Sequence, residues 1–290
     1  MQDGQSEANT TVTRFGTFEA ALRSATDLDA FAGSPEAAAL LDDILSQAED
    51  ARAVSFAVLD GILQFDHTSE LGRIAEAAAH FAADTGIASE AALVVGRLQS
   101  AAIAEEFSRG SGAASLSTIA RNMIQGLRIQ GRDTDELAAL WCTAELDVIA
   151  THIRPSPLVT KLLPRLVEGG KKIALISSRI YEADRIKPIL RDRAIGLPEG
   201  ASILSHADFD EAPSTLRAAE DALGIAPQDI LHLGPDLERD MVLAGAAGWK
   251  VRYLPVPDAV RAARRADHAA TATRLFGSAD YSLPQVLSDE

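Results

Sequence analysis

Oxygen-bearing side chains and a glycine stand at the ends of three short apolar runs of the sequence, residues 54–59, 173–177 and 230–233. Carboxylate oxygens are the ligands that Mg²⁺ prefers, and serine hydroxyls together with free backbone N–H groups bind anions. The candidate ligands of a weak magnesium site are therefore Asp60, Asp236 and Asp240. The candidate anion-binding residues are Gly61, Ser177 and Ser178.

Each of these groups also has a structural interpretation. Asp60 and Gly61 form an Asp-Gly pair, a dipeptide that is typical of turns whether or not a ligand binds. Ser177 is of the residue type that caps a following helix. Asp236 and Asp240 suit the cap and the positive end of a helix after their strand. We favour the turn for Asp60 and the cap for Ser177, and hold the two interpretations of Asp236 and Asp240 equal.

Two further groups of polar residues are interpreted as structural. His232 lies inside an apolar run, which favours a core histidine over a catalytic base. Three arginines cluster near the C-terminal end of the sequence, and we expect them to form a solvated helix face: Arg261, Arg264 and Arg265.

The elements that must position these residues follow from the spacing of apolar side chains. After Pro157, short apolar runs alternate with helical patterns, which predicts right-handed crossovers and a parallel sheet. The predicted strands are 173–177, 203–205, 230–233 and 251–254, with 54–59 as a further member. Because the carboxyl ends of parallel strands share one edge, that edge should hold the site.

The segment between Leu71 and Ile153 has apolar residues at helical spacing throughout. Its last helix should begin after Asp133, with Glu136 three residues on, and should pack through a seam that includes Leu137, Trp141 and Val148. The segment is therefore a helical cap inserted above the carboxyl edge of the sheet.

The N-terminal segment divides into a polar leader and a helical extension. Residues 1–13 offer little to bury, which predicts a disordered leader. Two short helices are expected over 15–49, the second starting at Ser34 and Pro35. We accordingly divide the chain into an extension at 1–52, an α/β core at 53–63 and 157–290, and a helical cap at 64–156.

Composition excludes several classes of partner. A net charge of −15 repels nucleic acid and anionic lipid surfaces. No apolar run approaches the roughly 20 residues that cross a bilayer. The single cysteine, Cys142, excludes an internal disulfide. These features favour the cytoplasm. The partner we expect is a protein or a second copy of the chain, with an anionic small molecule as the lower-ranked alternative.

Four motifs in order resemble those of the haloacid dehalogenase-like (HAD) superfamily, in particular a subgroup with a helical cap that is often associated with polysaccharide biosynthesis. Residues 54–63 read V-S-F-A-V-L-D-G-I-L and residues 176–181 read I-S-S-R-I-Y. The third motif should end at Leu216, and the fourth, residues 232–240, reads H-L-G-P-D-L-E-R-D. The resemblance implies a HAD-like Rossmannoid parallel sheet flanked by helices, and a site that takes phosphate esters and Mg²⁺.

The same motifs depart from the family pattern at its chemical positions. The nucleophilic aspartate is replaced by Ala57, or by Val58 in the other alignment. The lysine position holds Glu211 or Ala212, and the first acidic residue of the fourth motif is Pro235. The resemblance thus implies a pseudoenzyme without phosphohydrolase activity that acts as a binding or regulatory module. The alternative is a magnesium-dependent phosphohydrolase with relocated catalytic residues, with Asp60, Asp236 and Asp240 as its metal and nucleophile candidates.

Overall fold

The structure is a computed structural model that describes residues 16–87, 89–111, 114–129, 131–177, 180–193, 195–209 and 212–279. The predicted leader at 1–13 lies outside these residues, as do Ser178 and Glu211. Among the described helices, none has both the length and the apolar character needed to cross a bilayer.

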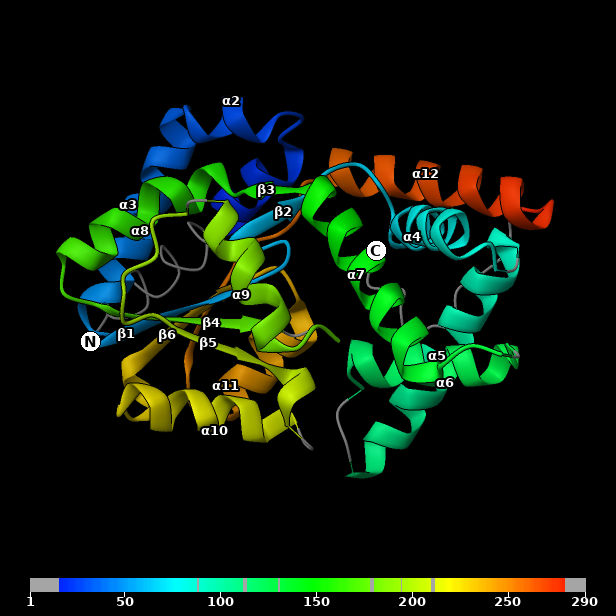
Figure 1. Cartoon of the computed structure of the whole chain (residues 1–290). Coiled ribbons are helices and arrows are strands. Elements are labelled where there is room, and N and C mark those ends of the chain that lie inside the picture. Colours follow the sequence, from blue (N-terminus) through cyan, green and yellow to red (C-terminus); the bar gives the residue numbers. More distant parts are fainter. Residues whose placement is uncertain are drawn as a thin grey trace, which may run out of the picture.

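A parallel sheet of five strands forms the centre of the α/β part (Figure 1). Its order is β5 (Ser202–Ser205), β4 (Lys172–Ser177), β1 (Ala53–Ala57), β6 (Ile230–Gly234) and β7 (Lys250–Tyr253). β1 is buried along its whole length. The predicted parallel sheet is therefore confirmed, with the strand that carries the first motif at its centre.

Side chains of β1 alternate between two apolar clusters, as the pleat of a strand requires. Val54 and Phe56 belong to the larger cluster, which also contains Leu40 and Ile44 from the N-terminal extension. Ala53 belongs to the smaller cluster, with Trp249 and residues of helix α10 (Ala212–Leu223). Both faces of the sheet are thus covered, which explains why its strands are continuous apolar runs.

Helices of the extension and the core cover these two faces. Figure 1 shows α2 (Leu28–Ala32), α3 (Pro35–Glu49) and α8 (Pro157–Glu168) on one side of the sheet, with α10 (Ala212–Leu223) and α11 (Ala244–Ala246) on the other. Residues 16–24 are also helical. Ser34 caps α3 by accepting a hydrogen bond from Ala37 N, with Pro35 in the first turn, as the sequence predicts.

The predicted helical insert is present as a bundle beside the sheet. It contains α4 (Glu70–Thr85), α5 (Glu90–Ser111), α6 (Leu116–Leu127) and α7 (Thr134–His152). The predicted start of α7 is confirmed, because Asp133 accepts a hydrogen bond from Glu136 N. Its predicted seam is also confirmed, because Leu137, Trp141 and Val148 are buried.

Two short strands that the sequence analysis missed join the insert to the core. β2 (Leu63–Phe65) pairs antiparallel with β3 (Ile153–Pro155). Each strand has only three residues, too few for an alternating pattern to stand out in the sequence. The chain therefore enters and leaves the insert side by side.

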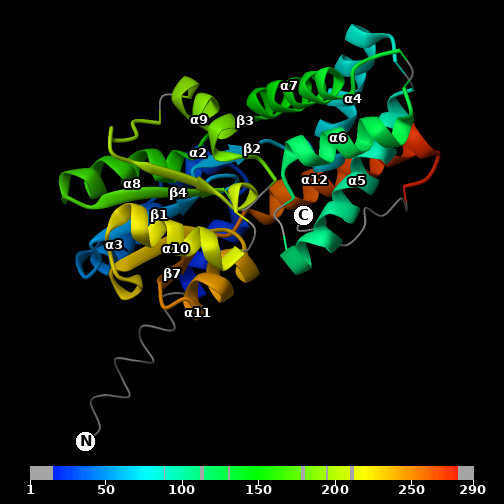
Figure 2. The same cartoon turned by 60° about the horizontal axis from the view of Figure 1, so that its bottom comes forward.

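The last helix, α12 (Asp258–Phe276), departs from the expected division of the chain. We assigned residues 157–290 to the α/β core, but α12 packs against α4 and α5 of the insert (Figures 1 and 2). An amphipathic pattern indicates that a helix is half-buried and does not say which surface covers it. α12 therefore begins after the last strand of the sheet and packs against the helical insert.

Replacing a buried aromatic side chain of the insert should destabilise the protein. Phe81 is buried and packs edge-on against Trp141, with ring centroids 5.6 Å apart. We expect Phe81→Ala to lower the free energy of unfolding by about 3–5 kcal/mol, because it leaves a cavity. Leu140→Ala, at an exposed position of α7, should change it by no more than about 0.5 kcal/mol. Urea denaturation followed by circular dichroism measures both; equal losses would contradict this packing.

Candidate active site

The residues singled out by the sequence meet at the carboxyl edge of the sheet. β1 ends beside β4 and β6, and Val58 N donates a hydrogen bond to Ile176 O across this edge. The tip of β1 presents the side chains of Ala57 and Val58, both buried. Neither side chain carries a lone pair, so neither alignment of the first motif puts a nucleophile at this tip.

Asp60 and Gly61 form the tight turn that follows β1. Asp60 has a positive φ of 57°, and Ala57 O accepts a hydrogen bond from Ile62 N across the turn. A Cβ atom at Gly61 would lie 2.2 Å from Ala57 O, so only glycine fits. The turn interpretation of both residues is confirmed.

The Asp60 carboxylate is held by an arginine from the other end of the chain. Arg264 Nη1 donates to Oδ2 at 2.9 Å, and Arg264 Nη2 donates to Oδ1 at 2.7 Å. The Phe65 backbone N–H also donates to Oδ1. The side chains of Arg264 and Asp60 are 5% and 12% exposed, so the ion pair is largely shielded from water. Asp60 is therefore committed to a bidentate ion pair.

Arg264 further organises the chain that leads into the insert. It donates to Phe65 O at 2.9 Å and to Asp66 O at 3.0 Å. The expectation that Arg261, Arg264 and Arg265 form a solvated helix face is wrong for Arg264, although Arg265 is exposed. Neighbouring residues on a helix point in different directions, and only the tertiary structure shows which of them faces the turn.

The two aspartates of the fourth motif also make internal hydrogen bonds. Asp236 caps the π-helix η3 (Leu237–Leu243), because its Oδ1 accepts from Glu238 N and Arg239 N. Asp240 Oδ2 accepts from Asp236 N at 2.9 Å, and its Oδ1 lies 3.2 Å from His232 Nε2. The capping interpretation is confirmed for Asp236, whereas Asp240 instead binds the chain that leads into η3.

His232 continues this polar row into the sheet. Its Nδ1 lies 2.6 Å from Ser55 Oγ, and its ring packs edge-on against Trp249. Ser55, His232 and Asp240 are nearly inaccessible to solvent. A serine, a histidine and an aspartate in a row suggest a hydrolase, but this serine is fully buried in the central strand, where no substrate reaches it. The interpretation of His232 as a core histidine is confirmed.

The three candidate magnesium ligands do not fit that ion. Asp60 is neutralised by Arg264, Asp236 faces backbone N–H groups of η3, and Asp240 bonds to His232 and to Asp236 N. Mg²⁺ requires several oxygen ligands at tightly defined positions around one point. Within the described part of the chain, no group of three or more His, Cys, Asp or Glu side chains is placed to hold a metal ion.

Ser177 is the last residue of β4. Its Oγ is buried and has no hydrogen-bond partner among the residues that the structure describes. The expectation that Ser177 caps the next helix is wrong, because α9 (Ala183–Asp192) begins after Glu182. The predicted role in anion binding, for Ser177 and for Gly61, remains a prediction.

A buried charged cluster that the sequence analysis missed connects the insert to the core. Arg97 of α5 donates from Nε and Nη2 to the two oxygens of Glu145 at 2.9 and 2.8 Å. Glu145 also accepts from Trp141 Nε1 and from the Tyr181 hydroxyl. Burial alone would lower the pKa of Arg97, but the Glu145 charge raises it above its ordinary value. Tyr181 lies in the motif at 176–181, whereas no spacing in the sequence points to Arg97.

Comparisons with known proteins concern the fold. No family model and no curated protein sequence matches this chain. A 2-haloacid dehalogenase structure from Pseudomonas syringae pv. Tomato DC3000 has 17% identity and a TM-score of 0.49, over 70% of this chain and 86% of that one. A haloacid dehalogenase-like hydrolase from Xanthomonas campestris has 16% identity and a TM-score of 0.47, over 78% of this chain and 95% of that one.

A predicted phosphoglycolate phosphatase from Haemophilus somnus 129pt has 15% identity and a TM-score of 0.44, over 72% of this chain and 90% of that one. At such identities a likeness says nothing about activity or substrate. The parallel sheet, with a helical insert after its central first strand, has the architecture that the motif resemblance implies.

Removing the arginine that holds Asp60 should cost far more stability than removing its exposed neighbour. We expect Arg264→Leu to lower the free energy of unfolding by about 3–5 kcal/mol, because it leaves a shielded carboxylate without a partner. Arg265→Leu should change it by no more than about 0.5 kcal/mol. Denaturation in urea measures both, and Arg264→Leu/Asp60→Asn should recover part of the loss, because asparagine is uncharged and tolerates the positive φ of this turn. Similar values for the two single variants would show that the ion pair does not hold this turn.

Proposed function

We propose that this chain is a HAD-like pseudoenzyme: it keeps the fold to bind a partner or an anionic ligand and does not hydrolyse phosphate esters. The observation that carries the proposal is the ion pair between Arg264 and Asp60. Asp60 is the acidic residue that the first motif retains, and the structure uses it to fasten α12 to the tip of β1.

Hydrolysis by an aspartate nucleophile needs a carboxylate oxygen that attacks phosphorus while the ester oxygen leaves. Ala57 and Val58 have no such oxygen. Asp60 would first have to separate from Arg264, which would leave an unpaired charge in a largely buried position. Loss of a nucleophile from a catalytic unit costs on the order of a millionfold in turnover.

A buried hydroxyl at the carboxyl edge of the sheet supports the proposal that this chain binds a ligand. Ser177 presents a buried hydroxyl without a partner among the described residues, next to the end of β1. An unpaired buried hydroxyl is costly, and a ligand oxygen would satisfy it. This support extends to an anionic small molecule; a protein partner or a second copy of the chain rests on the sequence analysis alone.

The relocated-enzyme alternative finds no comparable support. It would require Asp60 and Asp236 or Asp240 to converge on one ion, whereas all three carboxylates already accept hydrogen bonds from within the protein. We therefore rank it below the pseudoenzyme.

The absence of phosphatase activity is tested by comparing the wild type with Asp60→Asn. With Mg²⁺ and a panel of sugar phosphates and generic phosphate esters, we expect phosphate release no faster than in the variant. Asp60→Asn keeps the shape of the side chain, and circular dichroism checks that the variant folds. Mg²⁺-dependent turnover that Asp60→Asn abolishes would overturn the proposal, as would an acyl phosphate detected by intact mass after incubation with a phosphodonor.

Metal binding is tested separately with Mn²⁺, whose unbound fraction is measured by electron paramagnetic resonance. We expect the wild type and an Asp60→Asn/Asp240→Asn variant to deplete free Mn²⁺ equally, because neither carboxylate is available. Saturable binding that only the wild type shows would restore the relocated enzyme as the better interpretation.

A further inference from the structure

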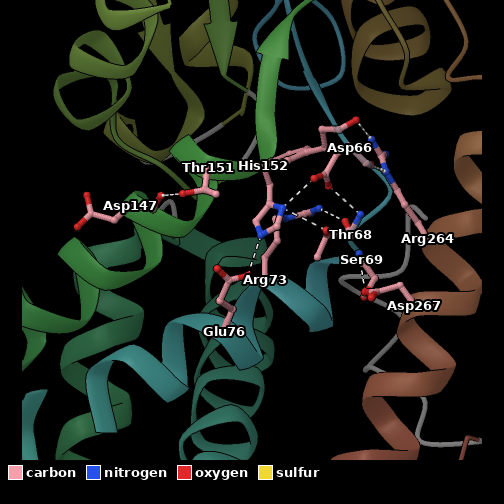
Figure 3. A network of polar contacts seen from close by, with 11 residues as sticks. Asp66, Thr68, Ser69, Arg73, Glu76, Asp147, Thr151, His152, Arg264 and Asp267 are labelled. Atoms are coloured by element: carbon pink, nitrogen blue, oxygen red, sulfur yellow. Dashed lines mark hydrogen bonds and ion pairs between the residues drawn. The ribbon is translucent and has the colours of Figure 1, made fainter. Parts of the chain in front are cut away.

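The two chain segments that connect the sheet to the helical insert meet at His152. This residue ends α7 and immediately precedes β3, while Asp66 follows β2 on the way in. Asp66 N donates to His152 O at 2.9 Å, which extends the pairing of β2 with β3. Figure 3 shows the His152 ring between the Asp66 and Glu76 carboxylates. The ring thus lies at the joint between the two parts of the molecule.

Both nitrogens of this ring are paired with carboxylate oxygens. Nδ1 lies 2.8 Å from Asp66 Oδ2, and Nε2 lies 2.7 Å from Glu76 Oε2 on α4. Thr68 Oγ1 is also 3.1 Å from Nδ1. A neutral imidazole has one N–H, whereas an imidazolium has two. Donation to both carboxylates therefore requires the protonated ring.

Helix α12 connects the same joint to the tip of β1. Arg264 Nε donates to Asp66 O, and the guanidinium also holds Asp60. Farther along α12, Asp267 Oδ2 accepts from Ser69 N at 2.9 Å and from Ser69 Oγ at 2.7 Å. A continuous set of polar contacts thus runs from Asp60, after the central strand, to His152 and α4. Figure 3 shows the part of it between Arg264 and Glu76.

We propose that this joint is a proton-operated clamp, in which protonated His152 holds the helical insert in the observed orientation and its deprotonation frees one carboxylate, so that the insert can reorient against the sheet. The inference goes beyond the proposed function, because it concerns the orientation of the insert whether or not a ligand is bound.

The charges around the ring favour its protonated form. Burial alone would lower the pKa of His152, but hydrogen bonds to Asp66 and Glu76 and their negative charges outweigh it and raise the pKa above the ordinary 6.5. For Asp66, burial acts to raise the pKa, but hydrogen bonds from His152 and Thr68 lower it overall. The other charged residues of this network are Arg73 of α4, Asp147 of α7, and Arg264 and Asp267 of α12.

The sign of the pH effect follows from these directions. A raised pKa in the folded state stabilises the protein fully below pH 6.5, and this contribution is lost as the pH rises through the folded pKa. The lowered pKa of Asp66 keeps its carboxylate charged down to below 3.8. The clamp is therefore closed in mildly acidic solution and opens on the alkaline side of 6.5.

Of the two contacts of the ring, we expect the one between His152 Nδ1 and Asp66 to break on deprotonation. When the ring loses a proton, the Thr68 hydroxyl is close enough to donate to Nδ1, while Nε2–H remains on Glu76. Asp66 then loses its ring contact, although Thr68 N still donates to Asp66 Oδ1. The separation thus falls between α7 and the segment that enters the insert.

Distances between spin labels on the two parts of the full chain test the clamp. Cys142→Ala removes the single buried cysteine, and exposed alanines supply the label sites: Ala139→Cys on α7 and Ala222→Cys on α10. Double electron–electron resonance at pH 6 should give one narrow distance distribution. Above the folded pKa of His152 we expect a second or broadened distribution, with the midpoint of the change above pH 6.5.

Two histidine variants in the labelled background separate the clamp from a general effect of pH. His152→Gln should give a distribution that no longer changes between pH 6 and pH 9. His80→Gln, an identical change at an exposed position of α4, should behave like its parent. Glu76→Gln should shift the midpoint toward pH 6.5, and it serves as the test if His152→Gln does not fold. A parent distribution that is constant with pH, or a change that persists in His152→Gln, would overturn the proposal.

Discussion

The bidentate ion pair between Arg264 and Asp60 is the interaction on which the rest of the arrangement depends. It joins the turn after the central strand to a helix more than two hundred residues later in the chain. The same guanidinium binds Phe65 O and Asp66 O, so it also fixes the segment that leads into the insert. An arginine with five donors can make all these bonds at once, which a lysine cannot.

This interaction occupies one of the polar groups at the carboxyl edge of the sheet. In an open α/β fold that edge is where ligands bind, and polar groups there normally face outward. Here Asp60 faces Arg264, Asp236 caps η3, and Asp240 completes a buried row with His232 and Ser55. The polar groups of the motifs thus accept hydrogen bonds within the protein, whereas the Ser177 hydroxyl has no hydrogen-bond partner among the described residues.

The insert is attached to the core at several separate places. Tyr181 of the core donates to the buried Glu145 of α7, and Leu116 N of α6 donates to Ile180 O. β2 and β3 form the covalent connection, and α12 lies across it. The insert is thus attached to the core on two sides.

The sequence by itself determined the parallel sheet, the inserted helical bundle, the seam of α7 and the presence of side chains without oxygen atoms at Ala57 and Pro235. These are local properties, because strand length, helical period and residue type are written in consecutive positions. The tertiary structure alone decided that Arg264 is buried, that α12 lies on the insert, and that Arg97 meets Glu145 and His152 meets Asp66 and Glu76. Such partners lie about fifty to two hundred residues apart in the chain, and no periodicity of one segment specifies which distant surface will cover it.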